Sequence, residues 1–145
     1  MRAIRPFEEF IKENVAKKQQ IDVSRAEFLF KEAENSYNNL LEKIDKIRMT
    51  DSNANDFIKS CYDIIMELVR AKMLLKGYNA SGFGAHEAEV AYMRIIGFSE
   101  NEVQFADQLR YFRNGMLYYG KILDAEYAKA VITFTTKCYN KLRVS

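Results

Sequence analysis

The chain has 145 residues, a net charge of +2 and a hydrophobic fraction of 48%. This length fits one domain, residues 1–145, and the hydrophobic fraction excludes a disordered chain. No apolar run approaches the roughly 20 residues that cross a bilayer. Residues 1–10 also lack the apolar core of a signal peptide, so we expect a cytoplasmic protein without a membrane partner.

The charge is segregated along the chain. Residues 1–50 hold ten basic and nine acidic residues, residues 51–108 hold five and nine, and residues 109–145 hold seven and two. The basic last segment also contains five of the nine tyrosines. This combination favours an anionic partner, with a solvated helix face as the alternative.

Apolar residues at spacings of three and four predict a series of helices. In chain order, we expect them at about 7–18, 22–47, 54–76, 85–96, 99–119 and from 125 onward. The boundary signals are Pro6, capping-box pairs at Ser24/Glu27 and Ser99/Glu102, glycines at 77, 97 and 120, and Asp124. The inward residues of the second helix are expected to be Phe28, Ala33, Tyr37, Leu40, Leu41 and Ile44.

These elements predict an all-α fold, an up-and-down bundle of four long helices plus one or two short helices. Residues 1–20 would form an extra N-terminal helix. The glycine-rich stretch 77–84 is expected to be a connecting loop. It is not a phosphate loop, because no Gly-Lys-Ser/Thr follows it.

Few residues are suited to metal chemistry. Cys61 and Cys138 have no second Cys or His at ligand spacing, and the chain has a single histidine, His86. Glu87 and Glu89 point to different sides of a helix, so they do not form a di-iron pattern. We therefore expect no metal site and no cofactor.

The segment 108–120 is the best candidate for a functional site. On a continuous helix, Asp107, Arg110, Asn114 and Tyr118 would share one polar face, with Arg113 at its border. Forked arginine donors beside an amide and a phenol suit a phosphate. Gly115 inside the helix would then mark the close approach of a ligand or another helix. The alternative is that the arginines only pair with acidic residues, Asp63, Glu67 or Asp107.

The sequence from Leu109-Arg110 through Arg113-Asn114 and Tyr118 to Tyr119-Gly120 resembles the signature helix of HEPN domains. In that helix an arginine, usually followed by a polar residue, precedes a histidine by four to six positions. Upstream, His86-Glu87 opening a short helix also resembles HEPN proteins. The resemblance covers about residues 55–140.

The resemblance implies a homodimer in which two signature helices face each other across a cleft, and in active members a metal-independent ribonuclease. Arg113 matches the arginine, Asn114 the polar residue and Tyr118 the histidine. A phenol with a pKa of about 10 is a poor general base at neutral pH, so the motif is degenerate and we expect phosphate binding without catalysis. The expected binding residues are Arg110, Arg113, Asn114, Tyr118, Tyr119 and His86.

Three functions follow from the sequence. The first is a HEPN-like protein that binds RNA or a nucleotide, with a nucleotidyltransferase-type partner as in toxin–antitoxin pairs. The second is a non-enzymatic dimeric interaction or scaffold protein. The third is a metal-independent ribonuclease in which His86 or Tyr118 replaces the missing base.

Overall fold

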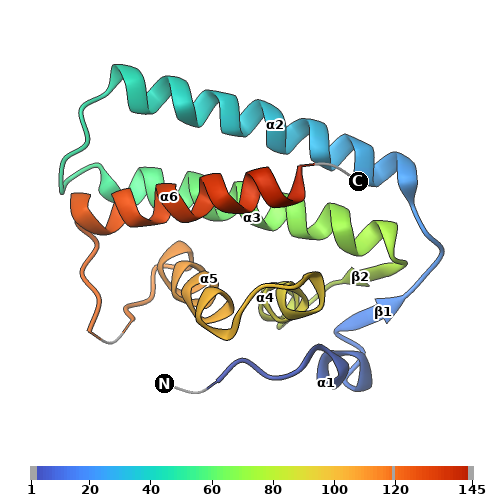
Figure 1. The fold of residues 1–145 in the computed structure, drawn as a ribbon. Helices are drawn as coiled ribbons and strands as arrows, with labels where there is room; N and C mark the ends of the chain where they lie inside the picture. Colours follow the sequence, from blue (N-terminus) through green and yellow to red (C-terminus); the bar gives the residue numbers. More distant parts are fainter. Residues whose placement is uncertain (1–2, 119, 144–145) are drawn as a thin grey trace.

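The computed structural model describes residues 3–118 and 120–143 and confirms the predicted all-α helical bundle (Figure 1). The helices are α1 (Phe7–Lys12), α2 (Val23–Lys46), α3 (Ala54–Leu75), α4 (Ala85–Ile96), α5 (Glu100–Arg113) and α6 (Ala125–Leu142). The described residues also form two short strands, β1 (Ala16–Lys18) and β2 (Tyr78–Ala80).

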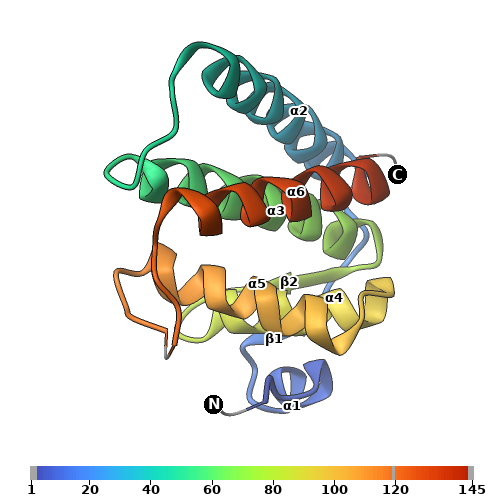
Figure 2. The same cartoon turned by 60° about the vertical axis from the view of Figure 1, so that its left-hand side comes forward.

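The long helices α2, α3 and α6 lie side by side along their lengths, and α4 and α5 cross on the other side of α3 (Figures 1 and 2). Helix α2 runs antiparallel to α3, whereas α6 runs parallel to it. The Ala125 N–H at the start of α6 donates to Asp51 Oδ1, just before α3, at 2.9 Å. At the other end, Leu142 of α6 and Leu75 of α3 line the same cavity. Helices α4 and α5 therefore carry the chain back to the end of the bundle at which α3 begins.

Helix α3 is the centre of the core, because α2, α4, α5 and α6 all pack against it. Its apolar residues at spacings of three and four are buried: Phe57, Cys61, Ile64, Leu68 and Ala71. On α2, by contrast, the predicted inward residues Phe28 and Leu41 are 61% and 44% exposed. Helix α2 lies on the outside of the bundle, so only a narrow stripe containing Ala33, Tyr37 and Leu40 is buried.

The predicted helix at 7–18 is wrong beyond Lys12. Asn14 has a φ of 61°, which ends helical geometry, and the chain continues as β1. This strand pairs antiparallel with β2, with Ala16 opposite Ala80 and Lys18 opposite Tyr78. Part of the predicted 77–84 loop is thus a strand, which ties the N-terminal segment to the end of α3.

Several boundaries match the prediction. Helix α4 spans 85–96 as expected, and the Ser99/Glu102 capping box opens α5. At α2 the N-cap is Asp22, whose side chain accepts from the Arg25 N–H, rather than the predicted box at Ser24. None of the helices within the described residues is both long and apolar enough to cross a membrane.

The end of α5 differs from the prediction in a way that changes the site. The helix stops at Arg113, Asn114 is its C-cap, and Gly115 follows with a φ of 74°. This left-handed backbone conformation suits glycine at a helix end. Gly115 therefore does not lie inside a helix, and no other part of the described chain comes within 4 Å of the position that a Cβ would take there. The predicted continuous face from Asp107 to Tyr118 does not form.

Candidate functional site

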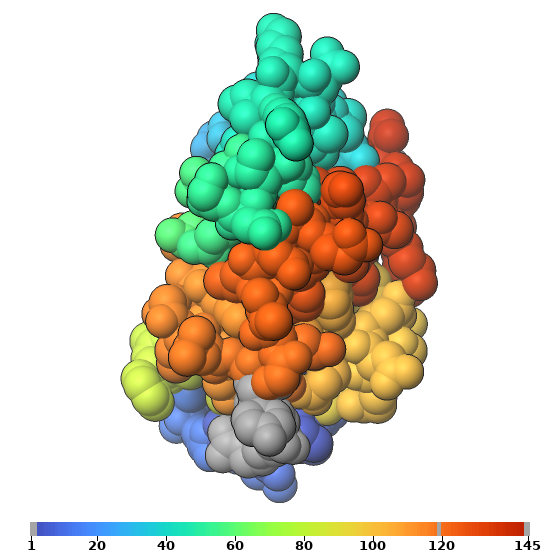
Figure 3. Space-filling view, turned by 90° about the vertical axis from the view of Figure 1, so that its left-hand side faces the viewer, coloured from blue at the N-terminus to red at the C-terminus, as the bar shows by residue number. Residues whose placement is uncertain are grey.

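A cavity of about 320 Å³ lies between the start of α4 and the end of α5. It brings together three of the predicted binding residues, His86 from α4, Arg110 from α5 and Asn114 at the α5 C-cap. The segment 82–85 and Glu87 complete the lining. On the surface, the yellow-green segment before α4 lies beside the orange end of α5 (Figure 3).

Arg110 is fixed in place on the α5 side of this cavity. Its Nε donates to Asp107 Oδ1 at 2.7 Å, one helical turn back, and its guanidinium lies 4.9 Å from the centre of the Tyr111 ring. Burial alone would lower the pKa of Arg110. The hydrogen bond that Arg110 donates to Asp107, with the negative charges of Asp107 and Glu87, outweighs that effect and raises the pKa of Arg110 above its ordinary value. Arg110 is therefore a fixed positive charge.

Arg113 lies at the surface and pairs with α3. Its Nε donates to Asp63 Oδ1 at 3.0 Å, and both side chains are substantially exposed, 41% for Arg113 and 51% for Asp63. The hydrogen bond to Asp63 raises the pKa of Arg113. The expected acidic partners Asp63 and Asp107 are thus found, while Glu67 instead lies near Arg70. Because the Arg113 pair is solvated, its guanidinium can exchange partners.

Tyr118 lies in the core instead of on a polar face with the arginines. Its side chain is 5% exposed, and its ring packs edge-on against Tyr111 with 5.2 Å between ring centres. Its hydroxyl accepts a hydrogen bond from Gln104 Nε2. The break of α5 after Arg113 explains this position, since the chain turns back and places Tyr118 over α5. Tyr119, also predicted to bind phosphate, lies outside the described residues.

Behind the cavity, a buried carboxylate connects α4 to α3. Glu89 is 3% exposed, and its Oε2 accepts from Arg70 Nε at 2.7 Å. Its Oε1 lies 3.1 Å from His86 Nδ1. Glu89 thus orients the His86 ring through Nδ1. The other ring nitrogen, Nε2, takes no part in this contact. The spacing of three residues between His86 and Glu89 could have predicted their contact, but no local pattern indicates Arg70.

Tyr62 of α3 lies between two buried ion pairs, Glu89–Arg70 and Asp107–Arg110. The charges of all four partners act on its hydroxyl. Burial, followed by the charge of Glu89, raises the pKa of Tyr62 well above its ordinary value. The hydroxyl is buried and has no hydrogen-bond partner among the described residues. We name Tyr62, Arg70, Glu89, Asp107 and Arg110 the buried charge cluster.

This arrangement suits an anion better than a metal ion. Guanidinium, imidazole and amide donors converge on the cavity, and Glu87 is the only acidic side chain among the described residues that line it. Arg5 Nε lies 3.8 Å from Glu87 Oε2, which offsets that negative charge. Among residues 3–118 and 120–143, no three His, Cys, Asp or Glu side chains gather as metal ligands.

Comparisons of the chain with family models, curated proteins and solved structures gave no match.

Proposed function

We propose that the chain is a HEPN-like protein that binds RNA or a nucleotide through the end of α5. The observation that carries the proposal is the convergence of His86, Arg110 and Asn114, from two separate segments, on one cavity. Arg113 lies next to Asn114 and is exposed. The buried charge cluster keeps Arg110 and His86 in place, so the donors are arranged before a ligand binds.

The proposal includes a homodimer that joins two such sites. Apolar side chains around the end of α5 are unusually exposed, with Phe83 at 101%, Leu117 at 88% and Ile122 at 75%. Phe83 also lines the cavity. Exposed apolar residues beside polar donors are typical of protein interfaces. A second copy that covers them would place two Arg113 side chains near one ligand.

Binding of a labelled single-stranded RNA, with AMP and ATP in parallel titrations, tests this proposal across a salt series. We expect tight binding at low salt and a linear fall of log K with log salt. In Arg113→Ala, the slope should decrease by about 0.7 for each phosphate that the arginine no longer neutralises. Arg48→Ala is the matched control, because Arg48 is an exposed arginine on a different part of the surface.

Absence of binding at low salt, or the same slope in Arg113→Ala and Arg48→Ala, would overturn the proposal. Either result would favour the non-enzymatic interaction protein, in which Arg110 and Arg113 only form ion pairs with Asp107 and Asp63. Sedimentation measures the dimer separately. Leu117→Asp should shift the chain toward monomer, whereas Phe28→Asp, on the outer face of α2, should not.

A second candidate, the metal-independent ribonuclease, is favoured by the contact between His86 and Glu89. An imidazole oriented by a carboxylate is a suitable general base, and His86 lies in the same cavity as Arg110. Tyr118 is not suited to that role, because it is buried and bonded to Gln104. Incubation of RNA with EDTA tests this candidate. Cleavage that disappears in His86→Ala supports it, and cleavage that persists in His86→Ala or is absent in the wild type contradicts it.

A further inference from the structure

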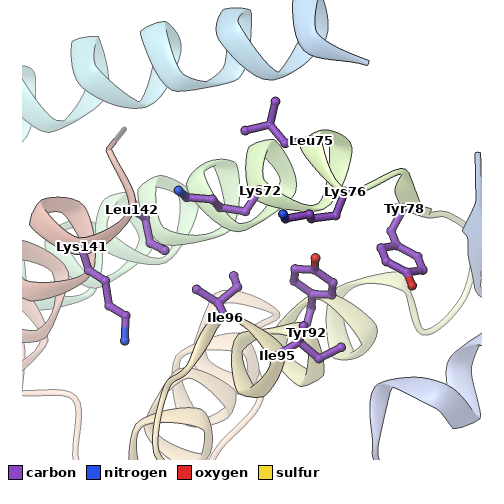
Figure 4. Close-up of a pocket in the computed structure, with 9 residues that line it drawn as sticks. All are labelled: Lys72, Leu75, Lys76, Tyr78, Tyr92, Ile95, Ile96, Lys141 and Leu142. Atoms are coloured by element: carbon purple, nitrogen blue, oxygen red, sulfur yellow. The ribbon is translucent and has the colours of Figure 1, made fainter. Parts of the chain in front are cut away.

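A second cavity, of about 700 Å³, lies where α3, α4 and α6 all end (Figure 4). It adjoins the C-terminal end of α4, whereas the candidate site adjoins the start of that helix. Its volume is within the range of about 300–1,000 Å³ that small-molecule sites occupy. The lining residues are Lys72, Leu75, Lys76, Tyr78, Tyr92, Ile95, Ile96, Lys141 and Leu142.

The walls of this cavity are mainly apolar. Aliphatic side chains come from all three helices, Leu75 from α3, Ile95 and Ile96 from α4, and Leu142 from α6. Ile95 is 53% exposed, so part of the apolar wall faces water. Exposed apolar surface that continues into a cavity can bind the hydrocarbon part of a ligand.

The charged side chains of the lining are all basic. Lys72 on α3 and Lys76, the C-cap of that helix, are four residues apart, and none of the described residues that line the cavity is acidic. Burial, followed by the charge of Lys76, lowers the pKa of Lys72. Figure 4 shows the Tyr92 hydroxyl directed toward the α3 wall that carries both lysines. Lys72 Nζ lies 5.7 Å from the centre of the Phe30 ring on α2. The Lys76 ammonium and the Tyr92 phenol are therefore the groups on this wall that an anion can reach, and Lys72 adds positive charge nearby.

Lys141 differs from Lys76. Its Nζ donates to the Gly97 carbonyl at 3.3 Å and lies 4.4 Å from the centre of the Phe98 ring. Its amine points away from the α3 wall (Figure 4). Lys141 thus stabilises the chain where α4 ends, as a lysine near a helix C-terminus does. A capping role of this kind does not explain the exposed apolar wall beside Lys72 and Lys76.

We propose that this cavity binds an aliphatic carboxylate, with its chain against the wall that includes Ile95 and Leu142 and its carboxylate at Lys76 and the Tyr92 hydroxyl. The aliphatic walls favour a hydrocarbon chain over a polar ligand. The positive charge of two lysines on one wall favours a negative headgroup. This site is separate from the proposed RNA-binding site.

Isothermal titration with decanoate below its micelle concentration tests the proposal, with decyltrimethylammonium as the cationic ligand of equal chain length. We expect decanoate to bind one to one and the cation not to bind. In Lys76→Glu, attraction becomes repulsion, and decanoate affinity should fall at least about tenfold. Lys129→Glu is the matched control, because Lys129 is an exposed lysine nearer the start of α6.

A second variant tests the hydrocarbon wall. Ile95→Ser removes exposed apolar surface and should weaken decanoate binding more than acetate binding. Circular dichroism confirms that each variant is folded. The proposal is overturned if decanoate does not bind, if the cation binds equally well, or if Lys76→Glu and Lys129→Glu have equal affinity.

Discussion

Two arginines of α5, three residues apart, form similar ion pairs in different surroundings. The Arg110 side chain is 16% exposed and its partner Asp107 is 6% exposed, whereas Arg113 and Asp63 are 41% and 51% exposed. A buried pair cannot lose one partner without leaving a charge away from water. An exposed pair is screened, and water replaces either partner at little cost. The same chemistry therefore holds Arg110 in place at the cavity and leaves Arg113 able to exchange Asp63 for a ligand.

The largest expected loss of stability comes from breaking an ion pair with a buried carboxylate, Glu89 with Arg70. Glu89→Ala removes the carboxylate that joins α4 to Arg70 of α3 and orients His86. Because it leaves the Arg70 guanidinium, on a side chain that is 34% exposed, without its carboxylate, we expect the free energy of unfolding to fall by about 2–3 kcal/mol, measured by urea denaturation. The control is Glu100→Ala, which removes an exposed carboxylate bonded to Arg94 and should cost less than about 1 kcal/mol. Equal losses in the two variants would contradict the role of burial.

The next largest effect on stability is expected when the two arginines are compared directly. Arg110→Ala should lower the free energy of unfolding by about 2 kcal/mol, because Asp107 is buried. Arg113→Ala should lower it by about 0.5 kcal/mol or less. Both are measured by urea denaturation at the same pH and salt. Reversed or equal losses would mean that exposure does not distinguish the two pairs.

The smallest effect is expected at Tyr62, whose buried hydroxyl has no partner among the described residues. At pH 7, Tyr62→Phe should leave the free energy of unfolding within about 1 kcal/mol of the wild type or raise it. Burial raises the pKa of Tyr62, so the folded state holds its proton more tightly than the unfolded state. The resulting stabilisation is complete below the unfolded pKa of about 10 and is lost as pH rises above it.

The alkaline range therefore gives the more informative test of Tyr62. Between pH 8 and pH 11, the wild type should lose more stability than Tyr62→Phe, because the variant has no phenol to ionise there. Thermal unfolding followed by circular dichroism measures both losses. The same loss in both proteins would contradict the buried position of Tyr62.

Local signals in the sequence predicted helix beginnings well. The Ser99/Glu102 pair and Asp124 act as predicted, because a cap depends on residues three positions apart. The end of α5 was missed although Asn114-Gly115 is a common helix stop. Phe112 and Met116, four positions apart, are also compatible with a longer helix, but Met116 is 42% exposed.

The other differences depend on contacts between distant segments. Strands β1 and β2 are three residues each and pair across about 60 positions, without an alternating pattern that would indicate them. The exposed face of α2 could not be predicted, since apolar spacing does not show how many neighbours a helix has. Of the residues that line the site, the sequence predicted His86, Arg110 and Asn114. Glu89 and Arg70 were not predicted, because their contact joins two helices.

The central claim is that Arg113 binds phosphate when it leaves Asp63, and a double-mutant cycle on RNA binding at low salt tests it most directly. Asp63→Asn removes the competing carboxylate, so we expect RNA affinity to rise about threefold to tenfold, since bonds between ionised groups are the strong ones. The same substitution in Arg113→Ala should give a much smaller gain. Asp56→Asn, elsewhere on α3, measures the general effect of removing negative charge. An equal gain from Asp63→Asn in both backgrounds, or no gain at all, would contradict the claim.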